Sequence, residues 1–161
     1  MNREKRGQAW GFDLMIASII FTAGIITFYI YSINTVEETD LMINKLSYDG
    51  NIIANTLLLE GTPKNWTEST VISPGILSKN KINQTKIDIF YDLTQNSYNK
   101  TKILLNTRYD FYIFFSKDIT ANGQIIQGIG RAPVNQKNLI KIERVAIYND
   151  QALTMNIEVW E

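Results

Sequence analysis

Few side chains in this chain could carry catalytic or metal chemistry. Its 161 residues include no histidine and no cysteine, so the commonest general base and the thiolate nucleophile and metal ligand are missing. Asp88 and Asp92 stand four apart in a helical pattern, a spacing that could pair two carboxylates. With no third ligand and no histidine beside them, we interpret them as part of a solvated helix face.

A glycine-rich segment, Gly128-Ile129-Gly130-Arg131, could indicate a phosphate-binding loop. It lacks the glycine and lysine spacing of such loops, and it stands at the end of an expected strand rather than before a helix. We interpret it as the exit from a strand. The sequence therefore predicts no catalytic residue, no metal site and no cofactor, and it favours a protein that is not an enzyme.

The charges also exclude one class of partner. The chain has 16 basic and 16 acidic residues and a formal net charge of zero, whereas proteins that bind nucleic acid usually carry a basic excess or patch. We expect no nucleic-acid partner. Three acceptor sequences for N-glycosylation are present; their asparagines are Asn65, Asn83 and Asn99.

The elements that position these residues begin with an apolar stretch near the N-terminus. Residues 14–33 hold no charge and no proline, which is long enough to cross a bilayer as a helix. Arg3, Lys5 and Arg6 precede it, and three acidic residues follow within 37–40. The positive-inside rule then places the N-terminus in the cytoplasm and the rest of the chain outside the cell. The small residues that would allow close helix packing in lipid are Ala17, Ser18, Ala23 and Gly24.

The junction before this stretch carries a family resemblance. Lys5-Arg6-Gly7-Gln8, followed by an acid at Asp13 and the apolar helix, resembles the class III signal peptide of archaeal type IV pilin-like proteins. The resemblance implies a cut between Gly7 and Gln8 by a prepilin peptidase on the cytoplasmic side. It also implies an assembly ATPase and a platform protein as partners, and self-association of the retained helix into a surface filament. An ordinary signal anchor would explain the charges and the length, but not this junction.

Asp13 departs from the family pattern. Many members carry a glutamate one position earlier, thought to neutralise the N-terminal amine of a neighbouring subunit. Asp13 either takes over this part, since carboxylates at the edge of hydrocarbon tend to be paired or functional, or simply favours the first helical turns through the helix dipole.

The rest of the chain reads as one soluble domain. We expect the helix to continue to Glu60 with an apolar stripe, Gly50 being a point where it could bend. A second helix is expected within 82–105, strongest over 81–93 and loosened at 97–101. The residues of the stripe are Val36, Ile43, Leu46, Ile53 and Leu57.

The last third favours strands. An aromatic strand over 109–115 is expected to return through Asn122-Gly123 as a strand over 124–130, and Asn149-Asp150 to join two further strands. The predicted fold class is α+β: a long N-terminal helix, a second helix, and an antiparallel meander of about four strands.

These expectations give three segments and one principal hypothesis. Residues 1–7 form a signal-peptide leader, 8–33 a transmembrane and filament-core helix, and 34–161 an extracellular pilin-like head. The sequence favours a structural subunit of an archaeal type IV pilus-like filament at the cell surface, with adhesion or spacing as the task of the head. The alternative is a monomeric, single-pass, membrane-anchored extracellular binding module.

Overall fold

The computed structural model describes the chain from residue 4 to residue 161, with side chains described for 11–33 and 40–161. It divides into two compact units, Met1–Leu41 and Met42–Glu161. Helix α1, Glu4–Leu57, contributes to both units. The described part of the first unit consists of this helix alone. The second unit, which we call the head, holds all the strands and the other helices of the described chain.

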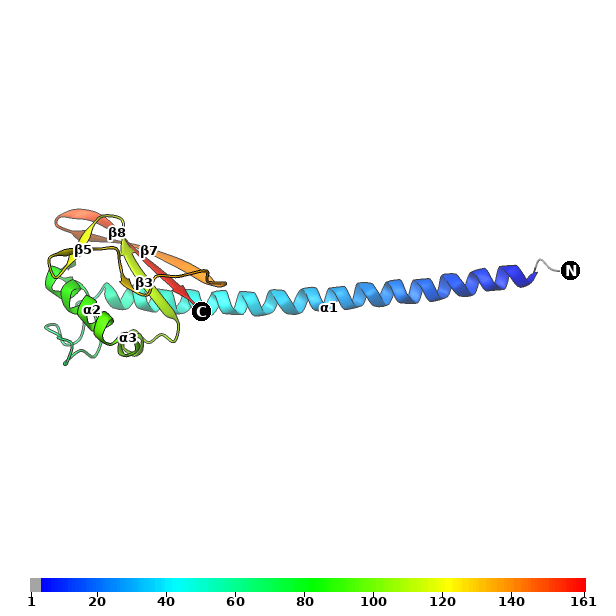
Figure 1. Cartoon of the computed structure of the whole chain (residues 1–161), viewed down its shortest axis with the longest axis horizontal. Coiled ribbons are helices and arrows are strands. Elements are labelled where there is room, and N and C mark those ends of the chain that lie inside the picture. The colour runs from blue at the N-terminus through cyan, green and yellow to red at the C-terminus, as the bar shows by residue number, and fades with distance from the viewer. Residues whose placement is uncertain (1–3) are drawn as a thin grey trace. The chain divides into compact units, whose positions relative to one another are not determined.

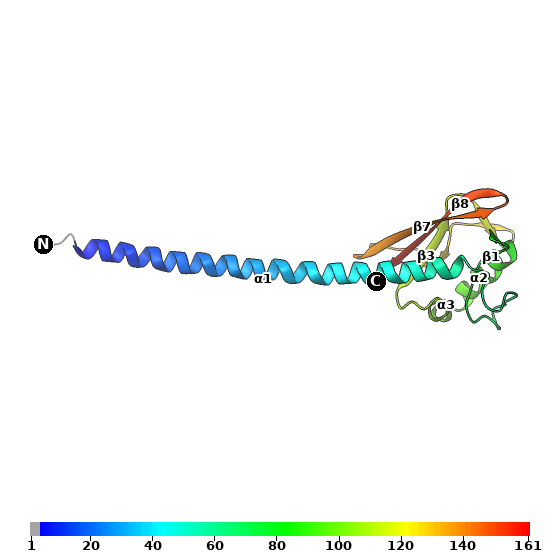
Figure 2. The ribbon, with the colours of Figure 1, turned by 180° about the vertical axis from the view of Figure 1, so that it is seen from behind.

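The head combines helices and antiparallel strands, so the predicted α+β class is confirmed. Its helices are α2, Gln84–Asn96, and α3, Tyr98–Leu104. Its strands are β1 Leu77–Ser78, β2 Lys81–Ile82, β3 Asp110–Phe115, β4 Ile119–Ala121, β5 Gln124–Ile126, β6 Ile129–Gly130, β7 Leu139–Tyr148 and β8 Gln151–Trp160. Figures 1 and 2 show the main sheet on one side of the end of α1, with α2 and α3 on the other.

The main sheet has the strand order β6-β3-β8-β7, with every neighbouring pair antiparallel. Strands β7 and β8 form a hairpin in which ten residues of each strand pair, from Leu139 with Trp160 to Tyr148 with Gln151. Asn149 and Asp150 make its turn with φ of 48° and 60°, the left-handed conformation that asparagine and aspartate tolerate best. This turn is where the sequence predicts it.

The turn at Asn122-Gly123 also forms as predicted, with φ of 52° and 77°, but it joins other strands. It connects β4 to β5 in a separate two-stranded sheet. The expectation that the strand over 109–115 returns through 124–130 is wrong in its main part. Strand β3 pairs along its length with β8, and only Ile129 and Gly130 of the expected returning segment lie beside it. The turn signal is satisfied by the short strands β4 and β5, and β3 pairs instead with the ten-residue strand β8.

The core of the head lies between the end of α1, the inner face of the sheet and α2. Leu46, Ile53 and Leu57 of the predicted stripe are fully buried, whereas Ile43 is 37% exposed. Alternate residues of β3 and β8 face these side chains, which is the period of a half-buried strand. Further fully or almost fully buried members of the core are Ile87, Phe90, Leu93, Phe111, Ile113, Met155, Ile157 and Val159.

Gly50 serves close packing rather than bending. Helix α1 runs through it without interruption. A Cβ atom built at this position would lie 2.9 Å from Ile140 Cδ1, 2.9 Å from Ile142 Cγ1 and 3.4 Å from Val159 Cγ2. The missing side chain therefore lets strands β7 and β8 approach the helix backbone.

The second helix is interrupted at Ser97, within the segment where the sequence predicts a break. Ser97 has φ −147° and ψ 58°, which are not helical, and its N–H donates to the carbonyl of Leu93. The hydroxyl of buried Thr101 also lies within hydrogen-bond distance of that carbonyl, at 3.3 Å. The chain thus turns from α2 into α3 with the last carbonyls of α2 satisfied.

Five side chains link α3 to the sheet. Tyr98 stacks on Phe111 with 5.2 Å between ring centroids, and the hydroxyl of Tyr98 accepts a hydrogen bond from the N–H of Phe111 at 2.9 Å. Burial raises the pKa of Tyr98 to about 12. Lys102 Nζ lies 2.9 Å from one oxygen of Asp110, and Arg131 Nη1 lies 3.5 Å from the other. Burial opposes ionisation of Asp110, but the two cations outweigh it and hold the pKa of this carboxyl below its usual value.

Candidate functional site: an exposed apolar helix and a lysine-lined pocket

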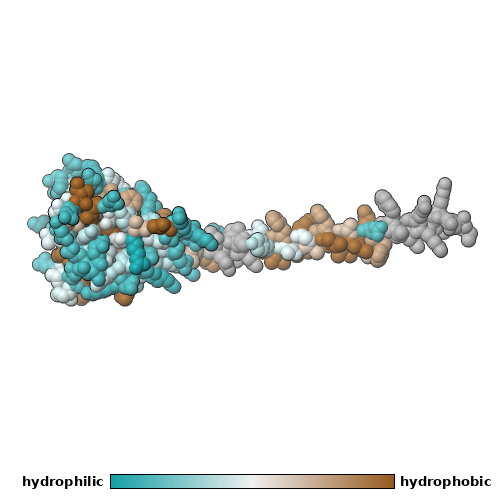
Figure 3. Space-filling view, in the orientation of Figure 1, coloured by the Kyte–Doolittle hydropathy of each residue, from teal (hydrophilic) through white to brown (hydrophobic). Residues whose placement is uncertain are grey.

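The first candidate site is the apolar part of α1. Residues Gly11–Ile33 form a helix long and apolar enough to cross a membrane, the one such helix found among the described residues. Every described side chain in this segment is exposed, and Figure 3 shows apolar side chains along it. Large apolar groups such as Leu14, Phe21 and Phe28 are 70–74% exposed. This surface needs an apolar environment that its own unit does not provide.

The polar groups of this segment fit such an environment. The Thr22 hydroxyl donates to the carbonyl of Ser18 at 2.8 Å, and the Thr27 hydroxyl donates to the carbonyl of Ala23 at 2.9 Å. Both hydroxyls are therefore satisfied within the helix, as hydrocarbon surroundings require. An added Cβ at Gly24 would meet no atom within 4 Å. Ala17, Ser18, Ala23 and Gly24 are all exposed, so their small side chains are available to a neighbouring helix.

The predicted processing junction lies at the start of α1. Lys5, Arg6, Gly7 and Gln8 belong to its first turns, and their side chains lie outside the described residues. Arg3 of the basic head also lies outside them, as does the side chain of Val36 in the predicted stripe. Asp13 is described, and its side chain is exposed two residues after the start of the apolar span.

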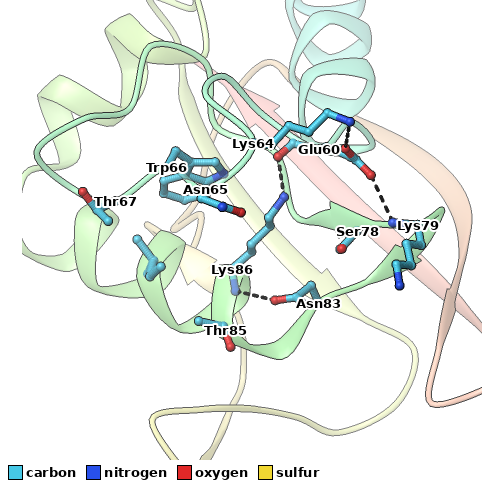
Figure 4. Close-up of a pocket in the computed structure, with 11 residues that line it drawn as sticks. Glu60, Lys64, Asn65, Trp66, Thr67, Ser78, Lys79, Asn83, Thr85 and Lys86 are labelled. Atoms are coloured by element: carbon cyan, nitrogen blue, oxygen red, sulfur yellow. Dashed lines mark hydrogen bonds and ion pairs between the residues drawn. The ribbon is translucent and has the colours of Figure 1, made fainter.

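The second candidate site is a pocket of about 620 Å³ in the head. Three elements form it: the loop after α1, the β1–β2 hairpin, and the first turn of α2 (Figure 4). Its volume lies within the range of small-molecule sites. The residues that line it are Glu60, Lys64, Asn65, Trp66, Thr67, Ser78, Lys79, Asn83, Thr85, Lys86 and Ile89.

Lys86 connects these three elements. Its ammonium group donates to the carbonyl of Leu77 at 2.8 Å and also to the carbonyl of Glu60. The backbone N–H of Lys86 donates to Asn83 Oδ1 at 3.1 Å, which caps the helix. Partial burial lowers the pKa of Lys86, and the charge of Glu60 acts in the opposite direction. A single side chain thus holds the pocket walls together.

Glu60 is committed to neighbouring groups. One carboxylate oxygen lies 3.0 Å from Lys64 Nζ, and the other accepts from the backbone N–H of Lys79 at 3.1 Å. The Lys64 side chain and then the Lys79 N–H lower the pKa of Glu60. The side-chain amine of Lys79 makes no hydrogen bond or ion pair with any described residue.

Trp66 forms a rigid wall of the pocket. It is 2% exposed, and its indole N–H donates to the carbonyl of Gly75 at 3.0 Å. Gly61, with φ 79°, brings the loop so close that an added Cβ would lie 2.6 Å from the indole ring. The pocket wall is therefore fixed by packing before any ligand arrives.

The three sequons differ in their surroundings. Asn65 is exposed in a loop, and its hydroxyl residue, Thr67, is also exposed. Asn83 is half-buried and caps α2. Asn99 is exposed within α3, but its hydroxyl residue, Thr101, is fully buried. An acceptor in a folded chain needs both residues within reach of the transferring enzyme, so Asn65 is the best placed of the three.

Asp88 and Asp92 hold the β4–β5 turn. One oxygen of Asp88 accepts from the N–H of Asn122 at 3.0 Å, and one oxygen of Asp92 accepts from the Asn122 amide at 2.7 Å. In the described part of the chain there is no group of three or more carboxylates that could hold a metal ion. The glycine-rich segment ends strand β6, where Gly130 has φ 110°.

Comparison of the chain with models of known families, with curated proteins and with solved structures finds no match. Its function has to be inferred from its own residues and geometry.

Proposed function

We propose that the protein is a structural subunit of an archaeal type IV pilus-like surface filament. A prepilin peptidase removes residues 1–7, and the chain then assembles through its apolar helix, with an assembly ATPase and a platform protein as partners. Before assembly the helix holds the chain in the cell membrane with its N-terminus in the cytoplasm and the head outside. The part that the protein plays is structural rather than catalytic.

The observation that carries this proposal is the uncovered apolar surface of Gly11–Ile33. In lipid this surface is solvated by acyl chains, and in a filament it is covered by the same helix of neighbouring subunits. Both environments cover the apolar surface. Neither leaves the Thr22 and Thr27 hydroxyls without a partner, because these hydroxyls donate to carbonyls of their own helix. Ala17 and Gly24 stand seven residues apart and so share one helix face, where a neighbour could approach closely. The basic-basic-Gly-Gln junction supports processing rather than simple anchoring.

The monomeric membrane-anchored binding module remains the second candidate, and the pocket in the head favours it. Such a module needs a membrane helix and a ligand site, and it needs no processing between Gly7 and Gln8.

The deciding experiment is the mass of the mature N-terminus after co-expression with an archaeal prepilin peptidase. We expect a chain that starts at Gln8, and a chain that keeps residues 1–7 when Gly7→Leu blocks the cut. The matched control is Gly11→Leu, which also adds a large side chain near the junction but leaves its residues intact; it should be processed normally. A wild-type chain that keeps its leader beside an active peptidase would exclude the filament route and favour the anchored module.

Asp13→Asn separates processing from assembly. If the carboxylate neutralises the amine of a neighbouring subunit, this variant is cut normally and forms few or no filaments by electron microscopy. Filaments as abundant as those of the wild type would show that Asp13 only favours the helix start.

A further inference from the structure

We propose that the pocket formed by the loop after α1, the β1–β2 hairpin and the start of α2 binds an acidic sugar, with its carboxylate or sulfate held by the amine of Lys79. This proposal concerns the head alone and does not depend on filament assembly.

The charge of the pocket selects an anion. Three lysines, Lys64, Lys79 and Lys86, line it against one carboxylate, Glu60. Glu60 is already bonded by the Lys64 ammonium and by the N–H of Lys79. Lys86 uses two of its three donors on carbonyls. The Lys79 amine has no partner among the described residues and is exposed, so it is the cation free to pair with a ligand.

The backbone of Lys79 adds a second, independent reason to assign it a role. Lys79 has φ 50° and Asn80 has φ 62°, so both central residues of the β1–β2 turn adopt the left-handed conformation. Asparagine, aspartate and glycine are favoured there, and lysine is not. Every other non-glycine residue with a positive φ in the described chain is an asparagine or an aspartate, and the presence of lysine at a disfavoured backbone position supports a function of its side chain.

The neutral lining indicates that the anion carries hydroxyl groups. Ser78 and Thr85 present hydroxyls, and Asn65 and Asn83 present amide N–H groups, for which the structure assigns no acceptor within the described chain. These groups donate to and accept from sugar hydroxyls, while Trp66 and Ile89 supply an apolar wall. A bare inorganic anion could accept from several of these donors, but it would fill only a small part of a pocket of about 620 Å³, whereas a sugar could reach donors on several walls. One carboxylate in the lining is too few ligands for a divalent cation.

The test is isothermal titration calorimetry with the full-length chain in detergent micelles, produced in a host that adds no N-glycans. The probes are glucuronate, glucose 6-sulfate, glucose, inorganic sulfate and inorganic phosphate. We expect at least one of the two acidic sugars to bind with a Kd of about 1 mM or tighter, and glucose and both inorganic anions to bind at least about tenfold more weakly. Which acidic sugar binds identifies the anionic group. Binding should weaken as salt is added.

The decisive variant is Lys79→Asn, which removes the amine while placing a favoured residue at the left-handed position. We expect it to weaken acidic-sugar binding about fivefold and to melt no lower than the wild type. Asn65→Asp, an exposed change that adds a negative charge to the lining, should weaken binding as well. The matched control is Lys137→Gln, which removes an exposed lysine that does not line the pocket and should leave the affinity unchanged.

Three results would overturn the proposal. Equal affinity for glucose and glucuronate would remove the selection for charge. Inorganic sulfate or phosphate binding as tightly as the acidic sugars would make this a simple anion site. A Lys79→Asn chain that is folded and binds as tightly as the wild type would remove the assigned cation. None of these results depends on processing at Gly7, so a failure here is distinct from a failure of the filament proposal.

Discussion

Substitution of Gly50 tests whether close packing or helix propensity governs this position. Gly50→Ala would gain about 1 kcal/mol from helix propensity alone. The new Cβ would stand 2.9 Å from two carbon atoms, Ile140 Cδ1 and Ile142 Cγ1, where carbon contacts prefer about 3.5–4.0 Å. Ile140 Cδ1 can move by rotation about χ2, whereas Ile142 Cγ1 moves only if χ1 or the backbone changes, and χ1 is stiff in a β-branched residue. Overpacking of this kind costs about 1–3 kcal/mol, so we expect a net loss between about 0 and 2 kcal/mol.

The assay is urea unfolding of the full-length chain in detergent micelles, followed by near-ultraviolet circular dichroism, which reports the packing of the aromatic side chains. Gly50→Val should lose more than Gly50→Ala, because its two further methyl groups enter the same space and it lacks most of the propensity gain. Ile140→Val removes the Cδ1 atom that the new Cβ would meet, so it should restore part of the loss caused by Gly50→Ala. The matched control is Ile147→Val on the outer face of the same strand, which should restore nothing.

One result would refute the reasoning outright. If Gly50→Ala is about 1 kcal/mol more stable than the wild type, then propensity governs the site and the strands do not press on the helix. A Gly50→Ala loss that Ile140→Val leaves unchanged would place the whole clash at Ile142.

Two further predictions follow from groups in the head. Lys102 and Arg131 hold the pKa of Asp110 below its usual value near 3.8. The ionised carboxylate therefore stabilises the fold above that pH, and this contribution is lost as the pH falls below it. Urea unfolding between about pH 6 and about pH 3 should therefore show a smaller loss of stability for Asp110→Asn than for the wild type; equal losses would contradict the pairing with Lys102. When the folded chain is offered to an oligosaccharyltransferase and its glycopeptides are measured by mass spectrometry, Asn65 should be modified and Asn99 should not, because Thr101 is buried. Unfolding the chain first should expose both acceptors, and modification of Asn99 in the folded chain would contradict the argument.

Local signals in the sequence predict the local structure well. Asn149-Asp150 and Asn122-Gly123 form turns because their residues tolerate positive φ. The apolar run of 14–33 contains no proline and lies within helix α1. The break at Ser97 lies within 97–101, the segment where the sequence predicts a loosened helix. Each of these features depends on a few consecutive residues.

The features that the sequence does not predict depend on residues far apart in the chain. The pairing of β3 with β8 joins Asp110 to Trp160, and no turn between them signals it. From the sequence, Gly50 is interpreted as a point where the helix could bend. Its close packing against Ile140 and Ile142 is evident only in the structure. The sequence does not predict the pocket, because its lysines come from three separate elements. The one local signal for it, a lysine at the first central position of the hairpin turn, is visible only once β1 and β2 are known to pair.

The position of Lys86 limits how the pocket could diverge over evolution. Its ammonium group supplies charge to the cavity and also ties the carbonyls of Glu60 and Leu77. A neutral residue at 86 would remove the charge and loosen the walls in one step. Lys79 and Lys64 are exposed at the surface, and either can be replaced without breaking a tie between elements. Chains of this fold that adapt to other ligands should therefore vary at 64 and 79 while retaining a donor at 86.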